Sequence, residues 1–471
     1  MTSLPQEQPA SVNPADLASP GAEGPPSEAM PGNSGAPEVP LSKRALNSSV
    51  LTAINYGGQQ ALRFGGNLLL TRLLFPEAFG LMALVQSFLI GLEMLSDVGI
   101  TPSIVHSKRG DEPDYLNTAW TLQAVRGAML WGVACALAFP AAWFYDRPEL
   151  QGMLPAIGVH ALLSGLSSTK LAVADRRLAI GRLTMIDLGS YAIGLAFTCF
   201  LAWQMKTVWS LVFGGYVQAT LKVLASHLLL EGERNRFRWD KSVLKEIGSY
   251  GRWILLSTAL GYLAIQGDRP VLGRLLGVKF LGVYTVALTL SQLPSEIIRQ
   301  AAGKVLFPSY SEIMRTAPEK LYATLRKSRL LLLAAAWTGC FFLIAVGTPL
   351  IKFLYDDRYE DAAWMLPVMA FGTLGHALIL SYDGILLATG NTHWLAFLLT
   401  IQTSIKFAAI FLGYYFAGKE GVVYGLATVT WLQYSADAWC MKRLGYWQPE
   451  IDFPLIGVGV ASALAYFTFF H

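Results

Sequence analysis

The sequence predicts an all-α integral membrane protein with twelve or thirteen spanning helices. Of its 471 residues, 53% are hydrophobic and 14% are charged; soluble domains have about one quarter charged residues. The mean hydropathy is +0.42. Apolar runs of about 20 residues, the length that crosses a bilayer, recur from residue 46 to the end. One water-soluble core cannot bury this much apolar surface, so we expect the bilayer to surround the chain.

Residues 1–42 differ from the rest of the chain. They contain nine prolines, five acidic residues and no lysine or arginine. This composition buries too little apolar area to order itself, and the segment lacks the basic start and apolar centre of a signal peptide. We therefore expect a disordered cytoplasmic tail.

Thirteen apolar stretches follow the tail, and each is a candidate transmembrane helix. Several contain glycine, proline or a charged residue, which favours helices that line a polar interior. The predicted spans cover residues 48–71, 78–105, 118–143, 150–174, 183–204, 208–231, 249–273, 281–307, 328–354, 363–389, 394–417, 420–441 and 454–470. The last stretch could span the membrane or lie re-entrant at its surface. A count of twelve, a count of thirteen and an arrangement like one of fourteen helices therefore all stay open.

Lysine and arginine are distributed between alternate loops as the positive-inside rule describes. With the N-terminus in the cytoplasm, the predicted inner loops contain 19 of these residues and the outer loops contain eight. Five of the 19 lie between the sixth and seventh spans. This bias predicts a cytoplasmic N-terminus.

The basic loop divides the helices into two groups of six. We predict an N-terminal lobe over residues 43–231, a basic cytoplasmic linker over 232–248 and a C-terminal lobe over 249–445. An extra C-terminal helix is predicted over residues 446–471.

The two halves also resemble each other in sequence. Residues 69–85 (LLTRLLFPEAFGLMALV) match residues 271–287 (VLGRLLGVKFLGVYTVA) at an offset of 202. The RLL tripeptides align, and so do Gly80 and Gly282. Both copies begin at an odd-numbered helix. The pattern therefore predicts repeats of the same orientation, related by an axis along the membrane normal.

Several motifs are similar to those of one transporter family. They are RLLFPEAFGL from residue 72, SDVGI at 96–100, LNTAW at 116–120, DRPVLGRLLGVKFLGVY at 268–284 and VLFPSYS at 305–311. From about residue 45 to 440 the chain resembles the polysaccharide exporters that include Wzx-type flippases. These belong to the multidrug/oligosaccharidyl-lipid/polysaccharide exporter superfamily.

The resemblance implies two six-helix lobes with pseudo-twofold symmetry around a central cavity, and transport by alternating access. The implied substrate is an undecaprenyl-pyrophosphate-linked oligosaccharide repeat unit. A flippase of this kind moves the unit across the bacterial inner membrane for exopolysaccharide, capsule or O-antigen (lipopolysaccharide) synthesis. Other expected partners are membrane lipids, a proton or sodium ion, a polysaccharide polymerase and a chain-length regulator. We expect transport rather than an enzyme, with no cofactor and no catalytic residue.

Charged residues within the spans are the main candidates for a site, because ionisable groups in a membrane are costly unless paired or hydrated. A pyrophosphate group needs several charge-assisted donors, and guanidinium can bind phosphate bidentately. We therefore predict a cationic cavity that contains Arg63, Arg126, Arg269, Arg299, Lys222 and Lys406.

Three acids are predicted either to couple transport to a cation gradient or to pair with the cavity cations: Glu93, Asp97 and Asp187. The opposing interpretation is local pairing throughout. Glu296 and Arg299 are three residues apart on one predicted helix and could neutralise each other.

Two other functions stay open. A drug/cation antiporter of the same superfamily would share the two lobes. A membrane glycosyltransferase or polymerase would need large outer loops with catalytic acids, whereas every predicted outer loop is short. The sequence contains no basic patch with interleaved aromatics for nucleic acid, no metal-ligand spacing among its four cysteines and no P-loop.

Overall fold

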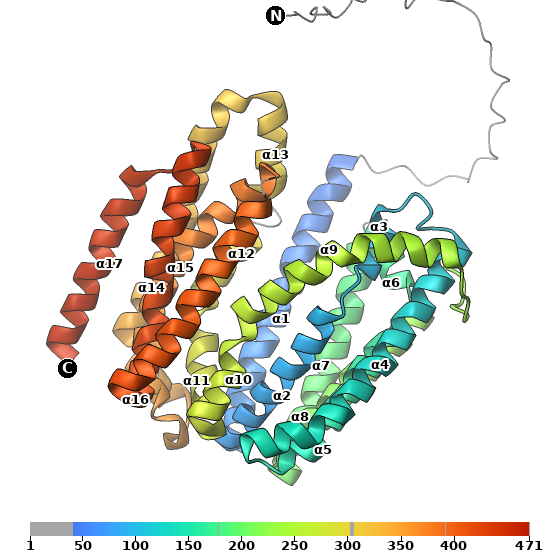
Figure 1. Cartoon of the computed structure of the whole chain (residues 1–471), viewed down its shortest axis with the longest axis horizontal. Helices are drawn as coiled ribbons and strands as arrows, with labels where there is room; N and C mark the ends of the chain where they lie inside the picture. Colours follow the sequence, from blue (N-terminus) through green and yellow to red (C-terminus); the bar gives the residue numbers. More distant parts are fainter. Residues whose placement is uncertain (1–40, 178, 302–305, 391, 471) are drawn as a thin grey trace, which may run out of the picture. The chain divides into compact units, whose positions relative to one another are not determined.

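The computed structural model describes residues 41–177, 179–301, 306–390 and 392–470, so nearly all of the predicted tail lies outside the described residues. All regular secondary structure in these ranges is helical, which confirms the predicted fold class. Figure 1 shows the helices in order along the chain. The first eight are α1 (Leu41–Leu73), α2 (Pro76–Leu95), α3 (Ile100–His106), α4 (Pro113–Tyr145), α5 (Glu149–Gly165), α6 (Lys170–Arg176), α7 (Ile180–Met205) and α8 (Trp209–Leu228).

The second half of the chain begins with α9, which starts inside the predicted basic linker. Its elements are α9 (Lys241–Gln266), α10 (Asp268–Leu275), α11 (Gly277–Ser291), α12 (Leu293–Ala301), α13 (Phe307–Thr316), η3 (Pro318–Lys320), α14 (Leu321–Leu354), η4 (Asp357–Tyr359), α15 (Ala362–Ala388), α16 (Thr392–Leu444) and α17 (Pro449–Phe470).

Each predicted span falls mostly within helices among the described residues, and two of the spans share the single helix α16. Among the described residues, six helices are long and apolar enough to cross a membrane singly. A seventh span results if α5 and α6, which are bent by 59° relative to each other, are counted together. This count takes in only the described residues, and α16, which contains two predicted spans, enters it once.

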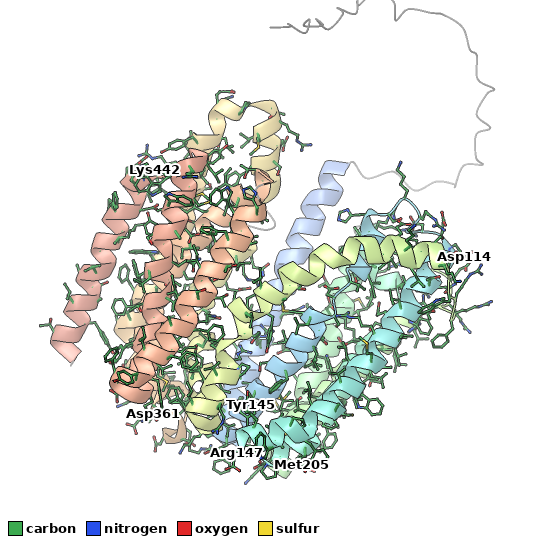
Figure 2. All side chains as sticks on the ribbon, in the orientation of Figure 1. Asp114, Tyr145, Arg147, Met205, Asp361 and Lys442 are labelled. Carbon is green, nitrogen blue, oxygen red and sulfur yellow. The ribbon has the colours of Figure 1, made fainter. Side chains whose placement is uncertain are left out.

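The helix ends follow the alternation that the charged loops predict. Asp114 and Lys442, from predicted inner loops, lie toward one end of the helices in Figure 2. Arg147 and Asp361, from predicted outer loops, lie toward the opposite end. Which end faces the cytoplasm stays an expectation from the basic residues.

The longest helix, α16, contains two predicted spans. Ala417 and Gly418 leave the helical conformation, and Gly418 has a φ of 57° that favours glycine. A Cβ atom on Gly413 would lie 2.2 Å from the carbonyl oxygen of Gly421. The chain therefore folds back at Gly418, and two closely packed antiparallel segments replace one continuous helix.

The basic segment before α9 is fixed to the N-terminal lobe. The Arg236 amide donates to Asn117 Oδ1 at 2.8 Å, and the Arg238 amide donates to Thr121 Oγ1 at 3.0 Å. The Arg238 side chain forms an ion pair of 2.9 Å with Asp114. Residues 233–240 are therefore an extended strap across the N-terminal end of α4.

The extra C-terminal helix α17 is tied to the C-terminal lobe by a buried ion pair. Arg329 of α14 and Asp452 of α17 have fully buried side chains, and their Nη2 and Oδ1 atoms lie 2.7 Å apart. Asp452 Oδ2 also accepts hydrogen bonds from the hydroxyls of Tyr382 and Tyr434. Ser381 Oγ accepts from Arg329 Nε at 2.9 Å. This network fixes four helices to one another: α14, α15, α16 and α17.

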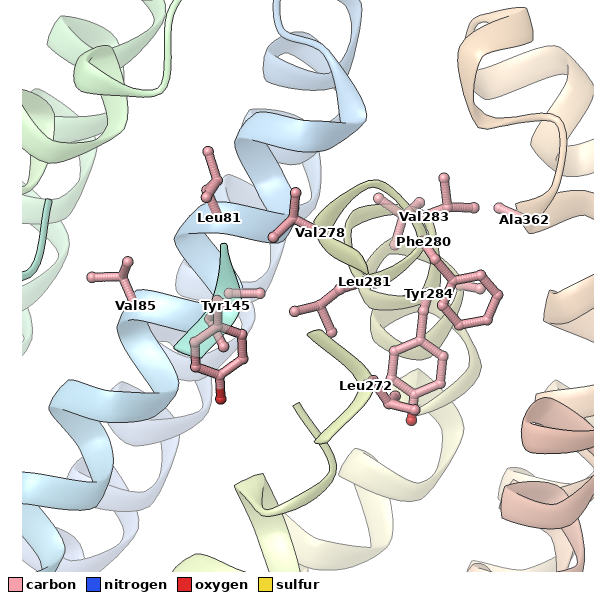
Figure 3. Packing of buried hydrophobic residues seen from close by; sticks show 14 of the residues in the cluster. Leu81, Val85, Tyr145, Leu272, Val278, Phe280, Leu281, Val283, Tyr284 and Ala362 are labelled. Atoms are coloured by element: carbon pink, nitrogen blue, oxygen red, sulfur yellow. The ribbon is translucent and has the colours of Figure 1, made fainter. Parts of the chain in front are cut away.

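The largest buried hydrophobic cluster joins the two halves of the chain. It includes Leu81 and Val85 of α2, Leu281 and Tyr284 of α11, and Ala362 of α15. Figure 3 shows these side chains where α2 and α11 pack against each other. The cluster fixes the position of α10, which precedes α11 and contains charged candidates for the site.

Candidate functional site

The predicted cations of the N-terminal lobe lie apart from one another. Arg63 is exposed on α1. Arg126 of α4 reaches the C-terminal end of α2, where its Nε donates to Ser96 Oγ at 3.0 Å and its Nη2 donates to the Glu93 carbonyl at 2.5 Å. A guanidinium in this position satisfies a free helix carbonyl and interacts favourably with the helix dipole. The structure therefore gives Arg126 a capping role.

Two of the predicted acids have local partners. Asp187 of α7 forms an ion pair of 2.8 Å with Lys222 of α8, a predicted cavity cation. Asp97 Oδ1 accepts a hydrogen bond of 2.9 Å from the amide of Gly99, which has a φ of 67°. These contacts favour the local-pairing interpretation for both acids and for Lys222.

Arg299 has a partner on its own helix. It forms an ion pair with Glu296, three residues earlier on α12. The arginine side chain is 58% exposed. The local pairing that the spacing allowed is therefore present.

The break between α9 and α10 brings three charges together. Asp268 is 4% exposed and accepts a hydrogen bond of 3.0 Å from the Tyr284 hydroxyl. Lys406 Nζ lies 3.9 Å from Asp268 Oδ1 and also donates to the carbonyl of Ala264. Arg269 has a buried Nε atom that lacks a hydrogen-bond partner among the described residues. We call Asp268, Arg269, Lys406 and Tyr284 the charged cluster.

The local sequence explains why the helix breaks at this cluster. Pro270 has no amide hydrogen and cannot donate to a carbonyl in the preceding turn. A Cβ atom on Gly267 would lie 2.5 Å from the Leu263 carbonyl oxygen and 3.0 Å from the ring of Phe407. Glycine therefore lets α16 approach the break, and this approach brings Lys406 to Asp268.

Two further residues extend the cluster along its neighbouring helices. His376 of α15 interacts electrostatically with Lys406 and with Glu296. Glu296 belongs to α12, so α12, α15 and α16 surround the same region. Neither His376 nor Tyr284 is among the site residues predicted from the sequence. A histidine within the apolar run 363–389 was the one signal that could have indicated His376.

The structure thus brings together two of the six predicted cations, Arg269 and Lys406. Arg299 lies on the adjoining α12 but pairs with Glu296. The other three lie in the N-terminal lobe, where two have local polar partners. The charged cluster has two positive groups and one negative group, which leaves it with a net positive charge.

The chain is similar in sequence to proteins of polysaccharide biosynthesis. A sequence profile of the family described as "Polysaccharide biosynthesis protein" matches residues 69–364. The chain is 24% identical over 280 residues to the amylovoran biosynthesis protein AmsL of Erwinia amylovora, covering 58% of this chain and 70% of that protein. It is 20% identical over 366 residues to the lipopolysaccharide biosynthesis protein WzxC of Escherichia coli, covering 76% of this chain and 73% of that protein.

Solved structures share the fold. An inward-facing MATE-family multidrug resistance transporter of the MOP superfamily superposes with a TM-score of 0.66 at 13% identity, covering 81% of this chain and 94% of that chain. The lipid II flippase MurJ superposes with a TM-score of 0.64 at 10% identity, covering 90% of this chain and 92% of that chain. At these identities the likeness concerns the fold alone.

Proposed function

This chain belongs to the family described as polysaccharide biosynthesis protein, and on that premise we propose that it is a flippase for undecaprenyl-pyrophosphate-linked oligosaccharide repeat units. Its relatives include proteins of amylovoran and lipopolysaccharide biosynthesis, and it shares its fold with a multidrug transporter and a lipid II flippase. The proposal adds the lipid-linked substrate and transport by alternating access.

The charged cluster is the observation that supports this proposal most directly. Arg269 has a buried guanidinium nitrogen without a hydrogen-bond partner among the described residues, and it directly follows Asp268, which pairs with Lys406. A buried donor that lacks an acceptor is costly, and a pyrophosphate oxygen would satisfy it with a charge-assisted hydrogen bond.

Each residue of the charged cluster has a separate role in binding the pyrophosphate group. Arg269 supplies the directional donor, and Lys406 supplies a second positive charge. Asp268 orients Lys406, and the Tyr284 hydroxyl holds the other oxygen of Asp268. The sugar and pyrophosphate cross between the lobes while the prenyl chain stays in the bilayer. The two lobes then expose this interior to each side of the membrane in turn.

Cation coupling is a further part of the proposal. Asp97 and Asp187 are engaged by a backbone amide and by Lys222, respectively. Of the three predicted acids, Glu93 is therefore our preferred coupling group. Purified protein in vesicles with a proton or sodium gradient tests this idea. We expect Glu93→Gln to flip substrate at a rate that no longer responds to the gradient, and a normal response would remove Glu93 from the mechanism.

The proposal is tested by flipping of lipid-linked oligosaccharide in vesicles that contain Arg269→Ala. Loss of one hydrogen bond to a charged group costs about 1.5–3 kcal/mol, which corresponds to a rate about 10- to 100-fold lower. Lys406→Ala should act in the same direction. The control is Lys327→Ala, which removes an exposed positive charge from α14. Normal flipping by both cluster variants would overturn the proposed headgroup site.

A deletion strain separates the proposed function from drug export. We expect lipid-linked sugar intermediates to accumulate on the cytoplasmic side, with unchanged sensitivity to cationic drugs. Increased drug sensitivity without accumulated intermediates would assign the chain to the antiporter function instead.

A further inference from the structure

The two halves of the chain approach each other closely where α2 and α11 cross at two glycines. A Cβ atom on Gly80 would lie 1.7 Å from the carbonyl oxygen of Val278 and 3.0 Å from the amide nitrogen of Gly282. These separations are far below contact distance, so no side chain fits at the crossing. Both positions therefore require glycine for as long as the helices touch.

The contact is reciprocal, residue for residue. A Cβ atom on Gly282 would lie 1.9 Å from the carbonyl oxygen of Pro76 and 3.0 Å from the amide nitrogen of Gly80. Gly282 stands 202 positions after Gly80, and Val278 stands 202 positions after Pro76. This is the offset of the internal repeat. Each helix contacts the residues that correspond to its own in the other repeat, which is the pattern that a twofold axis produces.

Two tyrosines flank the crossing in equivalent places. The hydroxyl of Tyr145, at the end of α4, donates to the Pro270 carbonyl at 3.2 Å. The hydroxyl of Tyr359, in η4 just after α14, donates to the Leu74 carbonyl at 3.3 Å. Each tyrosine thus follows the third predicted span of its own half. Each bonds the backbone where the first predicted span of the other half ends.

An arginine–phenylalanine contact lies beside each tyrosine. The guanidinium of Arg274 lies 5.5 Å from the ring centre of Phe144, and that of Arg358 lies 4.8 Å from the ring centre of Phe75. Arg274 and Arg358 both belong to the second half, whereas both rings belong to the first. Each flank therefore contains a tyrosine, an arginine and a phenylalanine. The arginine lies in α10 in one flank and in η4 in the other.

We propose that the pseudo-twofold axis runs between Gly80 and Gly282, and that this crossing is a clasp that closes the lobes at the end bearing Arg147 and Asp361. The clasp comprises Gly80, Gly282, Tyr145 and Tyr359. It must part for that end to open, so this inference rests on the alternating access of the proposed function. Tyr145 and Asp361 are labelled toward that end in Figure 2.

The chemistry of the clasp suits repeated opening. Its polar contacts are hydroxyl-to-carbonyl hydrogen bonds, and water can replace both partners when the lobes separate. The glycines themselves add no side chain to the crossing, whereas Leu81, Val85 and Leu281 pack around it, so opening must also separate these apolar side chains.

The test measures distances between spin labels on cysteines at Glu149 and Asp361, both exposed and on opposite lobes. The protein is held in lipid nanodiscs without substrate, with its four native cysteines replaced. We expect one short distance in the parent. Gly80→Ala and Gly282→Ala should each add a longer distance, because the new methyl group forces α2 and α11 apart.

The matched control is Gly215→Ala on α8, where an added Cβ atom would have nothing within 4 Å. If the glycine variants fail to insert, Tyr145→Phe combined with Tyr359→Phe removes both flanking hydrogen bonds without adding volume. This double variant should shift the distances in the same direction. An unchanged distribution in every folded clasp variant would overturn the proposal, and so would an equal shift in the control.

The measurement also separates the clasp from the proposed substrate. Label distances are recorded without lipid-linked sugar, so a different substrate class would leave the expected shift intact. Conversely, flipping of lipid-linked sugar by a protein whose label distances never change would remove the clasp and leave the substrate assignment standing.

Discussion

Two interhelical ion pairs in this protein lie in very different environments. Arg329 and Asp452 have fully buried side chains, and two tyrosine hydroxyls complete the coordination of the carboxylate. The side chains of Lys222 and Asp187 are 43% and 31% exposed. Altering the buried pair should therefore cost much more stability than altering the partly exposed pair.

Asp452→Ala should destabilise the protein strongly, because Arg329 would be left buried without its counter-charge. Removing one partner of a buried pair costs about 3–5 kcal/mol. Thermal unfolding in detergent measures the loss. Arg329→Met combined with Asp452→Leu should recover part of it, even though two tyrosine hydroxyls lose their acceptor. Equal stability of Asp452→Ala and the parent would show that water or another group compensates Arg329.

Exchanging the charges of the second pair should be nearly neutral. A partly exposed ion pair is worth about 0.2–1 kcal/mol. We expect Lys222→Asp alone to impair folding or flipping, and its combination with Asp187→Lys to restore both. Restoration would assign these residues to structure. If the exchanged pair folds normally but stays inactive in the vesicle assay, Lys222 or Asp187 acts on substrate or cation directly.

At the scale of elements, hydrophobic runs predicted where helices lie, because a spanning helix needs about 20 apolar residues. They did not predict where helices break. The run 249–273 contains Gly267 and Pro270, but a glycine or a proline within a membrane helix is often tolerated without a break. The break coincides with Gly267 and Pro270, but the local sequence does not show that Phe407 and Lys406 of α16 approach it.

Pro270→Ala tests whether flipping depends on the break between α9 and α10. The new amide can donate within the preceding turn, so we expect a straighter helix, unchanged or higher thermal stability and reduced flipping. Pro140→Ala in α4 is the matched control, since it also removes a proline from within a helix. Full activity of Pro270→Ala would mean that the cluster does not depend on the bend.

The start of α9 makes a prediction about pH. Asp240 caps this helix, and its hydrogen bonds with Ser242 hold the pKa of the Asp240 carboxyl below its usual value of 3.8. A lowered pKa stabilises the folded state above the unfolded value and loses that effect as pH falls through the folded value. Asp240→Asn should therefore reduce thermal stability at pH 7 and converge with the parent as the pH falls below 3.8 and through the lowered pKa of the folded state. A constant difference across this range would show that Asp240 acts without its charge.

At the scale of the whole molecule, the charge bias of the loops predicts which end faces the cytoplasm. Single cysteines at Asp361 and Lys442, which lie toward opposite ends in Figure 2, provide the test. We expect an impermeant thiol reagent added to intact cells to label position 361 and to spare position 442. The reverse pattern would invert the topology.

The site could be predicted only in part, because a sequence does not give the distances between side chains on different helices. Composition identified the rare charges within spans, and two of the six predicted cations belong to the charged cluster: Lys406 pairs with Asp268, and Arg269 follows Asp268 in the chain. Arg126 was indistinguishable in sequence from a ligand-binding arginine, because its role depends on the distant carbonyl of Glu93. His376 likewise becomes a site candidate only through its electrostatic interactions with Lys406 and Glu296 on neighbouring helices.

The Arg329–Asp452 pair also imposes an order on biosynthesis. The two residues are 123 positions apart, and α14 enters the membrane before α17 has been translated. At about 5–20 residues per second, the arginine waits roughly 6–25 s for its partner. During this interval the nascent lobe exposes an unneutralised guanidinium to the insertion machinery.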